Sequence, residues 1–238
     1  MNQCDINQYI KYMIPKISKY YIKRDESHGL EHVINVTNHA VTIANTYELT
    51  ELEYKIIIVS SLLHDAYDSK YVTVTQCIKD DISNLLNDEG YIKNHIDLIH
   101  NIIKNISFTK EVKEREYNKD SLKIIKYFDS DKEQLLRDIV SDADKIESLG
   151  ITGINRIIQY QNERMNDMIE PFSIKWYEIH LHHLYKVYYN RLILQLSHNY
   201  IRTKIGRTIA EPLYYTIIDV FNNYDLLYDY IDNVYNKN

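Results

Sequence analysis

The chain has 238 residues, of which 45% are hydrophobic and 26% are charged, and its formal net charge is −6. This composition predicts a soluble globular protein with a sizeable core, and the negative balance argues against a broad nucleic-acid surface while leaving a local basic pocket open. Two distant cysteines, Cys4 and Cys77, argue against a disulfide scaffold and favour a reducing cytoplasm. The N-terminal stretch shows no continuous apolar core of signal-peptide length, and no apolar run approaches the roughly 18 residues of a membrane span.

The sparse turn residues, five glycines and three prolines, predict helices rather than an all-β fold. The first strongly periodic segment is SHGLEHVINVTNHAVTIANTY, residues 27–47. Ser27 is the expected N-cap, and the residues expected to face inward are Leu30, Val33, Ile34, Thr37, Ala40 and Val41.

The next segment, TELEYKIIIVSSLLHD, begins with a capping box made by Thr50 and Glu53. Its expected apolar face is Leu52, Ile56, Val59 and Leu63. This helix ends in the adjacent pair His64-Asp65. Further along, the polar stretch TKEVKEREYNKD, residues 109–120, predicts an exposed loop within one domain.

The segment SDKEQLLRDIVSDADKIESLG predicts a helix with a capping box made by Ser130 and Glu133, and with Gly150 at its C-terminal cap. Its apolar stripe is Leu135, Leu136, Ile139, Val140, Ala143 and Ile146. Residues from about 174 to 199 and from 208 to 233 are also amphipathic. We therefore expect one all-α domain over residues 1–238, with its main motifs at about 20–160 and C-terminal helices at about 174–233 packing on them.

Three of these segments carry side chains that can bind a metal. They are His32, with His28 one turn earlier, then the pair His64-Asp65, and then Asp144, which lies one turn after a buried valine. Imidazole and carboxylate without thiolate form a donor set for Mn, Mg, Co, Fe or Zn. Each piece alone is common in proteins, since a single His-Asp pair often arises by chance, so the order along the chain carries the prediction.

That order resembles the H…HD…D motif of the HD-domain metal-dependent phosphohydrolases. SHGLEHVINV is similar to the opening element of that superfamily, and LLHDAYDSKY to the form found in small stand-alone nucleotide phosphohydrolases. IVSDADKIESLGITGINR resembles their third element, and RTKIGRTIAEP resembles a stretch of their final helices. The resemblance spans roughly residues 20–230 and implies an all-α HD-domain helical bundle with a central metal site.

The resemblance implies one divalent ion, with the ligands His32, His64, Asp65 and Asp144. Asp142 is the less favoured member of the DAD pair by its position in the motif. Two-metal members carry an extra pair of histidines between HD and the last aspartate, whereas this chain has only His95 and His100 there. One ion is therefore expected, and a diiron oxygenase is disfavoured.

The resemblance also implies residues around the substrate. Asp68 matches an acid that orients the attacking water or protonates the leaving oxygen, with capping of the next helix as its alternative. Lys70 and Lys145 are candidate phosphate contacts, with solvated lysines as the alternative. His28 matches a residue near the substrate phosphates or has a helix-start role, and Arg207 reaches the pocket or forms a structural ion pair.

The chain departs from the superfamily pattern at two positions. Glu147 stands where many members have aspartate, and Ile106 stands where many have histidine, which puts one substrate contact in doubt. His39 is interpreted as packing or as a neighbour of the ligands, and His182-His183 as scaffold.

The expected function is metal-dependent hydrolysis of a phosphate ester or anhydride in a nucleotide-like small molecule, through a metal-activated water that involves Asp65 and Asp68. The alternative is a catalytically silent HD domain that binds a nucleotide or regulates a partner. No membrane partner is expected, and the substrate, the metal and any homo-oligomer stay open.

Overall fold

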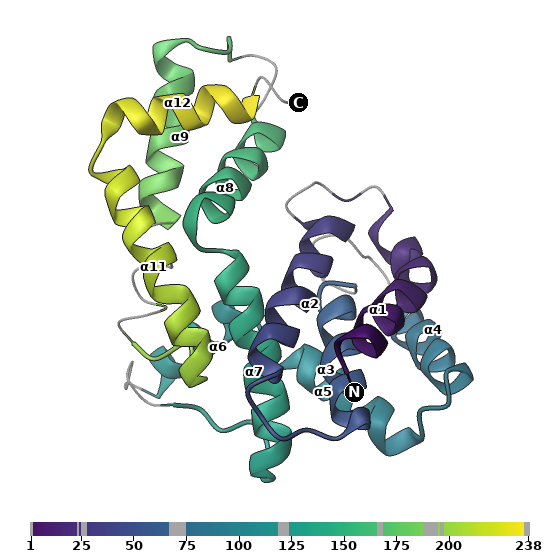
Figure 1. Cartoon of the computed structure of the whole chain (residues 1–238). Coiled ribbons are helices and arrows are strands. Elements are labelled where there is room, and N and C mark those ends of the chain that lie inside the picture. The colour runs from purple at the N-terminus through teal and green to yellow at the C-terminus, as the bar shows by residue number, and fades with distance from the viewer. Residues whose placement is uncertain are drawn as a thin grey trace.

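The computed structural model describes residues 2–22, 24, 28–66, 75–118, 124–165, 169–187, 195 and 198–235. All regular structure in these ranges is helical, which confirms the all-α prediction (Figure 1). The helices are α1 (Gln3–Ile17), η1 (Ser18–Tyr21), α2 (Leu30–Ala44), α3 (Glu51–Leu63), α4 (Thr75–Asp88), α5 (Lys93–Lys104), α6 (Phe108–Tyr117), α7 (Asp131–Glu147), α8 (Gly150–Arg164), α9 (Ile174–Val187), α11 (Lys204–Phe221) and α12 (Tyr224–Tyr235).

Helix α2 lies at the centre of the arrangement and packs most extensively on α3 and α7. Helices α1 and α5 pack on α3, and α4 packs on α5. Helices α8, α9, α11 and α12 form a second group, seen on the left of Figure 1, which is joined to the first through α7. The chain therefore brings α2, α3 and α7 together as one central layer.

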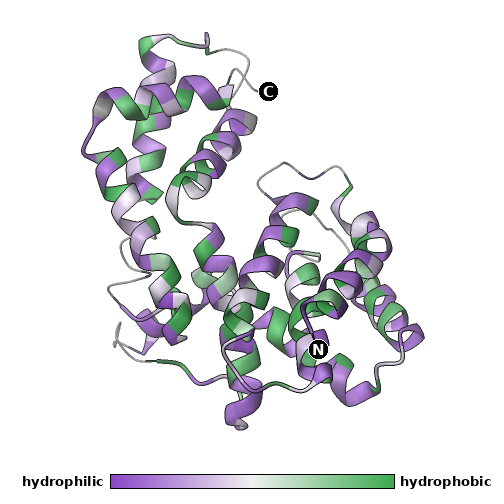
Figure 2. Cartoon of the chain, viewed as in Figure 1, coloured by the Kyte–Doolittle hydropathy of each residue, from purple (hydrophilic) through white to green (hydrophobic). Residues whose placement is uncertain are grey.

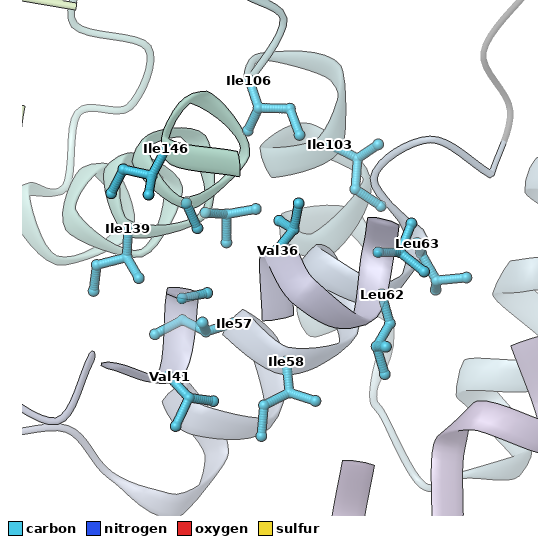
Figure 3. Packing of buried hydrophobic residues seen from close by; sticks show 14 of the residues in the cluster. Val36, Val41, Ile57, Ile58, Leu62, Leu63, Ile103, Ile106, Ile139 and Ile146 are labelled. Atoms are coloured by element: carbon cyan, nitrogen blue, oxygen red, sulfur yellow. The ribbon is translucent and has the colours of Figure 1, made fainter. Parts of the chain in front are cut away.

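The core is continuous from α1 to α12 and consists mainly of isoleucine, leucine and valine. Figure 3 shows side chains such as Val36, Ile58, Ile103 and Ile139 converging from four helices. Most helices are amphipathic, with hydrophilic and hydrophobic sides visible in Figure 2, but α3 is buried on all sides from Ile56 to its end. None of the helices in the described ranges combines the length and apolarity needed to cross a membrane.

Helix starts agree with local sequence signals in most cases. The reciprocal capping box of Thr50 and Glu53 is present at α3, and the Ser130 side chain accepts a hydrogen bond from the Glu133 amide at α7. Ser27 lies outside the described residues, and α2 instead begins after Gly29 as its N-cap, so the predicted start was wrong. Leu52 is 38% exposed, because it lies in the first turn of α3, beyond the buried part of the helix.

The C-terminal ends of the predicted helices also differ in detail. Helix α7 is capped by Ser148, whereas Gly150 adopts a left-handed φ of 63° where α8 begins. The segment at 208–233 contains two helices, α11 and α12, separated at Asn222 and Asn223, and α11 already begins at Lys204. Most of residues 188–199 lie outside the described ranges.

The prediction of an exposed loop at 109–120 was wrong, because residues 108–117 form α6. Two of its charged side chains, Glu111 and Arg115, are fully buried and form an ion pair of 2.7 Å one helical turn apart. Burial of such charges is tolerated because further cations from α7 and the start of α11 surround Glu111. Residues 119 and 120 lie outside the described ranges.

Candidate metal centre

The four predicted ligands come together from three helices in the central layer. His32 lies in the first turn of α2, His64 caps the C-terminus of α3 and is followed by Asp65, and Asp144 lies in the last turn of α7. They meet because α2 packs against both α3 and α7. Among the described residues, His32, His64 and Asp144 form a group whose donor atoms lie within 4.8 Å of one another.

The separations between the donor atoms fit an ion between them. The two Nε2 atoms of His32 and His64 are 3.2 Å apart, and Asp144 Oδ1 is 3.6 Å from each. Asp65 Oδ2 is 3.5 Å from His64 Nε2 and 3.8 Å from His32 Nε2. Most of these distances are long for direct hydrogen bonds. They match ligands that each lie about 2.0–2.2 Å from a shared divalent ion, which places neighbouring donors roughly 3–3.6 Å apart.

Both imidazoles are suited to bind a cation. His64 Nδ1 donates to the Ser61 carbonyl oxygen at 2.7 Å, so its Nε2 carries the free lone pair that faces His32. Burial lowers the pKa of His32, which favours its neutral form. Two imidazoles whose Nε2 atoms converge are ordinary ligands for a divalent transition metal.

The two carboxyl groups are held ionised. Burial by itself would raise the pKa of Asp65, but His64 and His32 bring it below its usual value. Burial likewise opposes ionisation of Asp144, yet the adjacent His32 ring, His64 and the Arg156 guanidinium lower its pKa well below the usual range. The site therefore offers two anionic carboxylates beside the two imidazoles at neutral pH.

The His64-Asp65 pair is positioned by contacts to the backbone at the end of α3. The Tyr21 hydroxyl donates to the Leu62 carbonyl oxygen at 2.6 Å. The Arg24 guanidinium donates to the carbonyl oxygens of Asp65 and Ala66 at 2.7 and 2.8 Å. These groups satisfy carbonyls that a helix end leaves without partners, and they hold the pair in place.

Asp142 faces a different part of the molecule. Its carboxylate is fully buried and accepts hydrogen bonds from the backbone amides of Arg202 (2.9 Å) and Thr203 (2.6 Å), just before α11. Burial raises the pKa of Asp142 above its usual value despite these bonds. Asp142 therefore joins α7 to α11, while Asp144 faces α2 and α3.

Lys145 is not presented to a substrate, which corrects the predicted phosphate contact. Its side chain is 1% exposed, and its Nζ contacts Ser141 Oγ at 2.6 Å and Glu111 Oε2 at 3.4 Å. Burial lowers the pKa of Lys145 to about 8. Lys145 belongs to the buried charge cluster around Glu111, because the helical turn directs it away from Asp144.

Of the remaining residues predicted to contact substrate, the structure describes Arg207 and His28. Arg207 is exposed and donates to the Arg202 carbonyl oxygen at 3.0 Å, near the start of α11. Asp68 and Lys70 lie outside the described residues. His28 lies directly beside the candidate ligands, with its ring 6.3 Å from that of His32.

The two departures from the superfamily pattern have clear structural consequences. Glu147 accepts hydrogen bonds from Asn35 at 3.0 Å and pairs with His39 at 3.2 Å, so it links α7 to α2 next to the candidate ligands. Ile106 is buried in the core, as Figure 3 shows.

His100, one of the two histidines between the HD pair and the last aspartate of the motif, contacts Ser83 Oγ at 2.9 Å, between α5 and α4.

Arg156 was missed by the sequence interpretation. It lies on α8, close enough to act electrostatically on both His32 and Asp144. The sequence did contain a clue, because Arg156 is the last residue of ITGINR, which ends the third motif element. Its distance of twelve residues from Asp144 gave no indication that α8 folds back toward α2.

No protein-family model and no curated protein matches the sequence. Solved structures do match. A Lactobacillus plantarum protein superposes with a TM-score of 0.62 at 17% identity, covering 96% of this chain and 98% of that chain. YpgQ from Bacillus subtilis, in complex with ADP, has a TM-score of 0.61 at 18% identity, with 90% and 94% covered. An HD-superfamily hydrolase from Bacillus thuringiensis has a TM-score of 0.59 at 17% identity, with 91% and 95% covered.

These likenesses extend over nearly the whole length of each chain. They establish that the protein has the HD-domain fold, as the motif order predicted. At such identities they establish the fold alone, so the activity has to be argued from the site.

Proposed function

We propose that the protein is a divalent-metal-dependent phosphohydrolase that acts on a nucleotide or a related small phosphate compound. The observation that supports this most is the convergence of His32, His64, Asp65 and Asp144 from three helices, at separations suited to one ion. The two imidazoles are buried and the two carboxylates are only partly exposed, so without such an ion the carboxylate charges would be poorly compensated.

His32, His64, Asp65 and Asp144 would hold the divalent ion, which would supply Lewis acidity for activating water and for offsetting charge on a phosphoryl oxygen. The residues of the chain do the rest. Arg156 on α8 is proposed to attract the phosphate groups, and His28, just before α2 and beside His32, to contact them, which brings phosphorus to the ligands. Asp68, three residues after Asp65, is proposed to take or give the proton, and Lys70 to contact phosphate.

The nucleotide part of the proposal has independent support. YpgQ, which shares the fold over 90% of this chain, was solved with ADP. The substrate side of the site here is basic and aromatic, as expected for a phosphate compound that carries a ring. A cytoplasmic location, as expected from the cysteine content, would give access to such substrates.

A product-resolved hydrolysis screen tests the function. Metal-stripped protein is incubated with Mn, Mg or Co and with ribo- and deoxyribonucleoside mono- and triphosphates, and phosphate is separated from pyrophosphate. Pyrophosphate from triphosphates would identify a pyrophosphohydrolase, and phosphate from monophosphates a nucleotidase. Binding of a nucleotide without turnover under any ion would favour the silent binding module instead.

Replacement of Asp65 by alanine should abolish turnover and bound metal while the helix content stays unchanged, because one of four donors is removed at a helix end. Activity, metal content by elemental analysis and circular dichroism check this expectation. Asp97→Asn, an exposed acid on α5, is the matched control and should keep both activity and metal. Full turnover in Asp65→Ala would contradict the proposed function.

A further inference from the structure

A hollow of about 270 Å³ lies between α8 and α9, outside the candidate metal centre. It is lined by Gln161, Glu178, Ile179, His182, His183 and Lys186. Its volume is just below the roughly 300–1,000 Å³ of pockets that enclose a whole drug-sized ligand. The hollow therefore suits one ring of a ligand whose remainder lies elsewhere.

Aromatic rings connect this hollow to the metal centre. His183 stacks on Tyr160 with 6.1 Å between ring centroids and 25° between ring planes. Tyr160 meets His28 at 6.4 Å, and His28 meets the candidate ligand His32 at 6.3 Å. Three ring-to-ring steps thus lead from the hollow to the candidate ligands.

Cations accompany this row of rings on α8. Arg156, Tyr160 and Arg164 follow one another at intervals of four residues, so they share one face of the helix. The Arg164 guanidinium lies over the Tyr160 ring at 4.5 Å, and Arg156 acts on the ligands at the other end. Of these two cations, Arg156 is the one on the ligand side of Tyr160, where the phosphates of a nucleotide would extend, and Arg164 flanks the Tyr160 ring on its other side.

The polar groups of the hollow suit the edge of a nucleobase. The Gln161 side chain has both a donor and an acceptor, and Glu178 adds an acceptor. His183, on the facing helix, offers a ring for stacking, and stacking accommodates any base because every base has a π face. The interpretation of His182-His183 as scaffold did not anticipate this position, because it depends on how α9 packs against α8.

We propose that His183, backed by Tyr160, forms a stacking platform for the nucleobase in the α8–α9 hollow, with the phosphates directed along Arg156 toward the metal centre. The platform rests on the proposed function for its ligand class. It makes the base, and not only the phosphates, part of what the protein recognises.

Binding of two probes, ADP and inorganic pyrophosphate, tests the platform in the full-length chain with Mn present. Tyr160→Leu and His183→Ala should each weaken ADP binding by roughly ten-fold, which is the loss expected for one aromatic stacking partner. Both variants should bind pyrophosphate as the unmodified protein does, which also shows that they fold. Tyr160→Phe keeps the aromatic ring, so this variant should retain ADP binding within about two-fold of the unmodified protein.

Tyr215→Leu is the matched control, because this tyrosine is 57% exposed on α11 and should leave both affinities unchanged. The platform is overturned if ADP binds the two variants as well as the unmodified protein, or if ADP and pyrophosphate weaken equally, or if the unmodified protein binds no ADP. Failure of the proposed function would show differently, as selective ADP binding without turnover in the metal screen.

Discussion

Asp142 and Asp144 illustrate how two acids two positions apart on one helix acquire different roles. Residues two apart on an α-helix are rotated by about 200°, so their side chains leave nearly opposite faces. Asp144 faces His32 and His64, whereas Asp142 receives the amides of Arg202 and Thr203. One carboxylate belongs to the candidate metal centre and the other holds α11 against α7.

Replacing each acid by alanine should separate these roles. Asp144→Ala should lose bound metal, because it removes a donor, without weakening the metal-free fold. Asp142→Ala should keep the metal but lose about 1–3 kcal/mol of unfolding free energy, because two buried amides lose their acceptor. Metal content and thermal unfolding in the presence of a chelator measure both effects. Loss of metal from Asp142→Ala at unchanged stability would reverse the assignment.

Helix α6 shows that a high density of charged residues does not by itself predict an exposed loop. Its sequence is polar, yet Glu111 is fully buried and pairs with four cations, at 2.6 Å from Arg202, 2.7 Å from Arg115, 3.3 Å from Arg137 and 3.4 Å from Lys145. One carboxylate therefore ties α6 to α7 and to the start of α11. Burial opposes ionisation of Glu111, but these cations lower its pKa far below the usual value.

Glu111→Gln should destabilise the protein by about 3–5 kcal/mol at neutral pH, because the buried cations lose their counter-charge. A carboxyl whose pKa is lower in the folded state adds stability above its unfolded pKa of about 4.3, and this stability is lost as pH falls below that value. The unmodified protein should therefore lose stability more steeply below about pH 5 than the variant does. Urea unfolding at several pH values measures this difference.

The control for this measurement is Glu116→Gln, which changes an exposed glutamate on the same helix. It should alter stability by no more than about 0.5 kcal/mol and keep the pH dependence of the unmodified protein. A loss in Glu116→Gln equal to that of Glu111→Gln would mean that α6 contributes through its net charge and not through the buried cluster.

At the scale of the whole molecule, the candidate metal centre exists only when α2, α3 and α7 pack together. His32, His64 and Asp144 come from three helices, and His32 and Asp144 are 112 residues apart along the chain. The neighbouring hydrogen bond from Asn35 to Glu147 joins residues with the same separation. The unfolded chain cannot offer this arrangement, so metal binding is linked to folding.

Metal should therefore raise the thermal stability of the protein. At an ion concentration near 100 times Kd the stabilisation is about 2.7 kcal/mol, which corresponds to an increase in Tm of roughly 5–10 °C for a chain of this size. Thermal melting with Mn and with a chelator measures the increase, and Asp65→Ala should abolish it. An equal increase in Asp65→Ala would place the bound ion elsewhere.

Features that depend on neighbours along the chain were predictable from the amino-acid sequence. The capping box of Thr50 and Glu53, the end of α3 at His64-Asp65 and the apolar stripe of α7 were predictable, because caps and periodicity act within a few residues. The motif order also predicted the HD-domain fold and the residues that converge at its centre.

The burial of polar side chains, and the groups that they face, became visible only in the packed helices. The burial of α6, the turn of Lys145 toward Glu111 and the approach of Arg156 and Tyr160 to the centre depend on partners far away in sequence. A charged side chain is stable inside a protein only when opposite charges or hydrogen bonds meet it there, and the packing of helices supplies these partners.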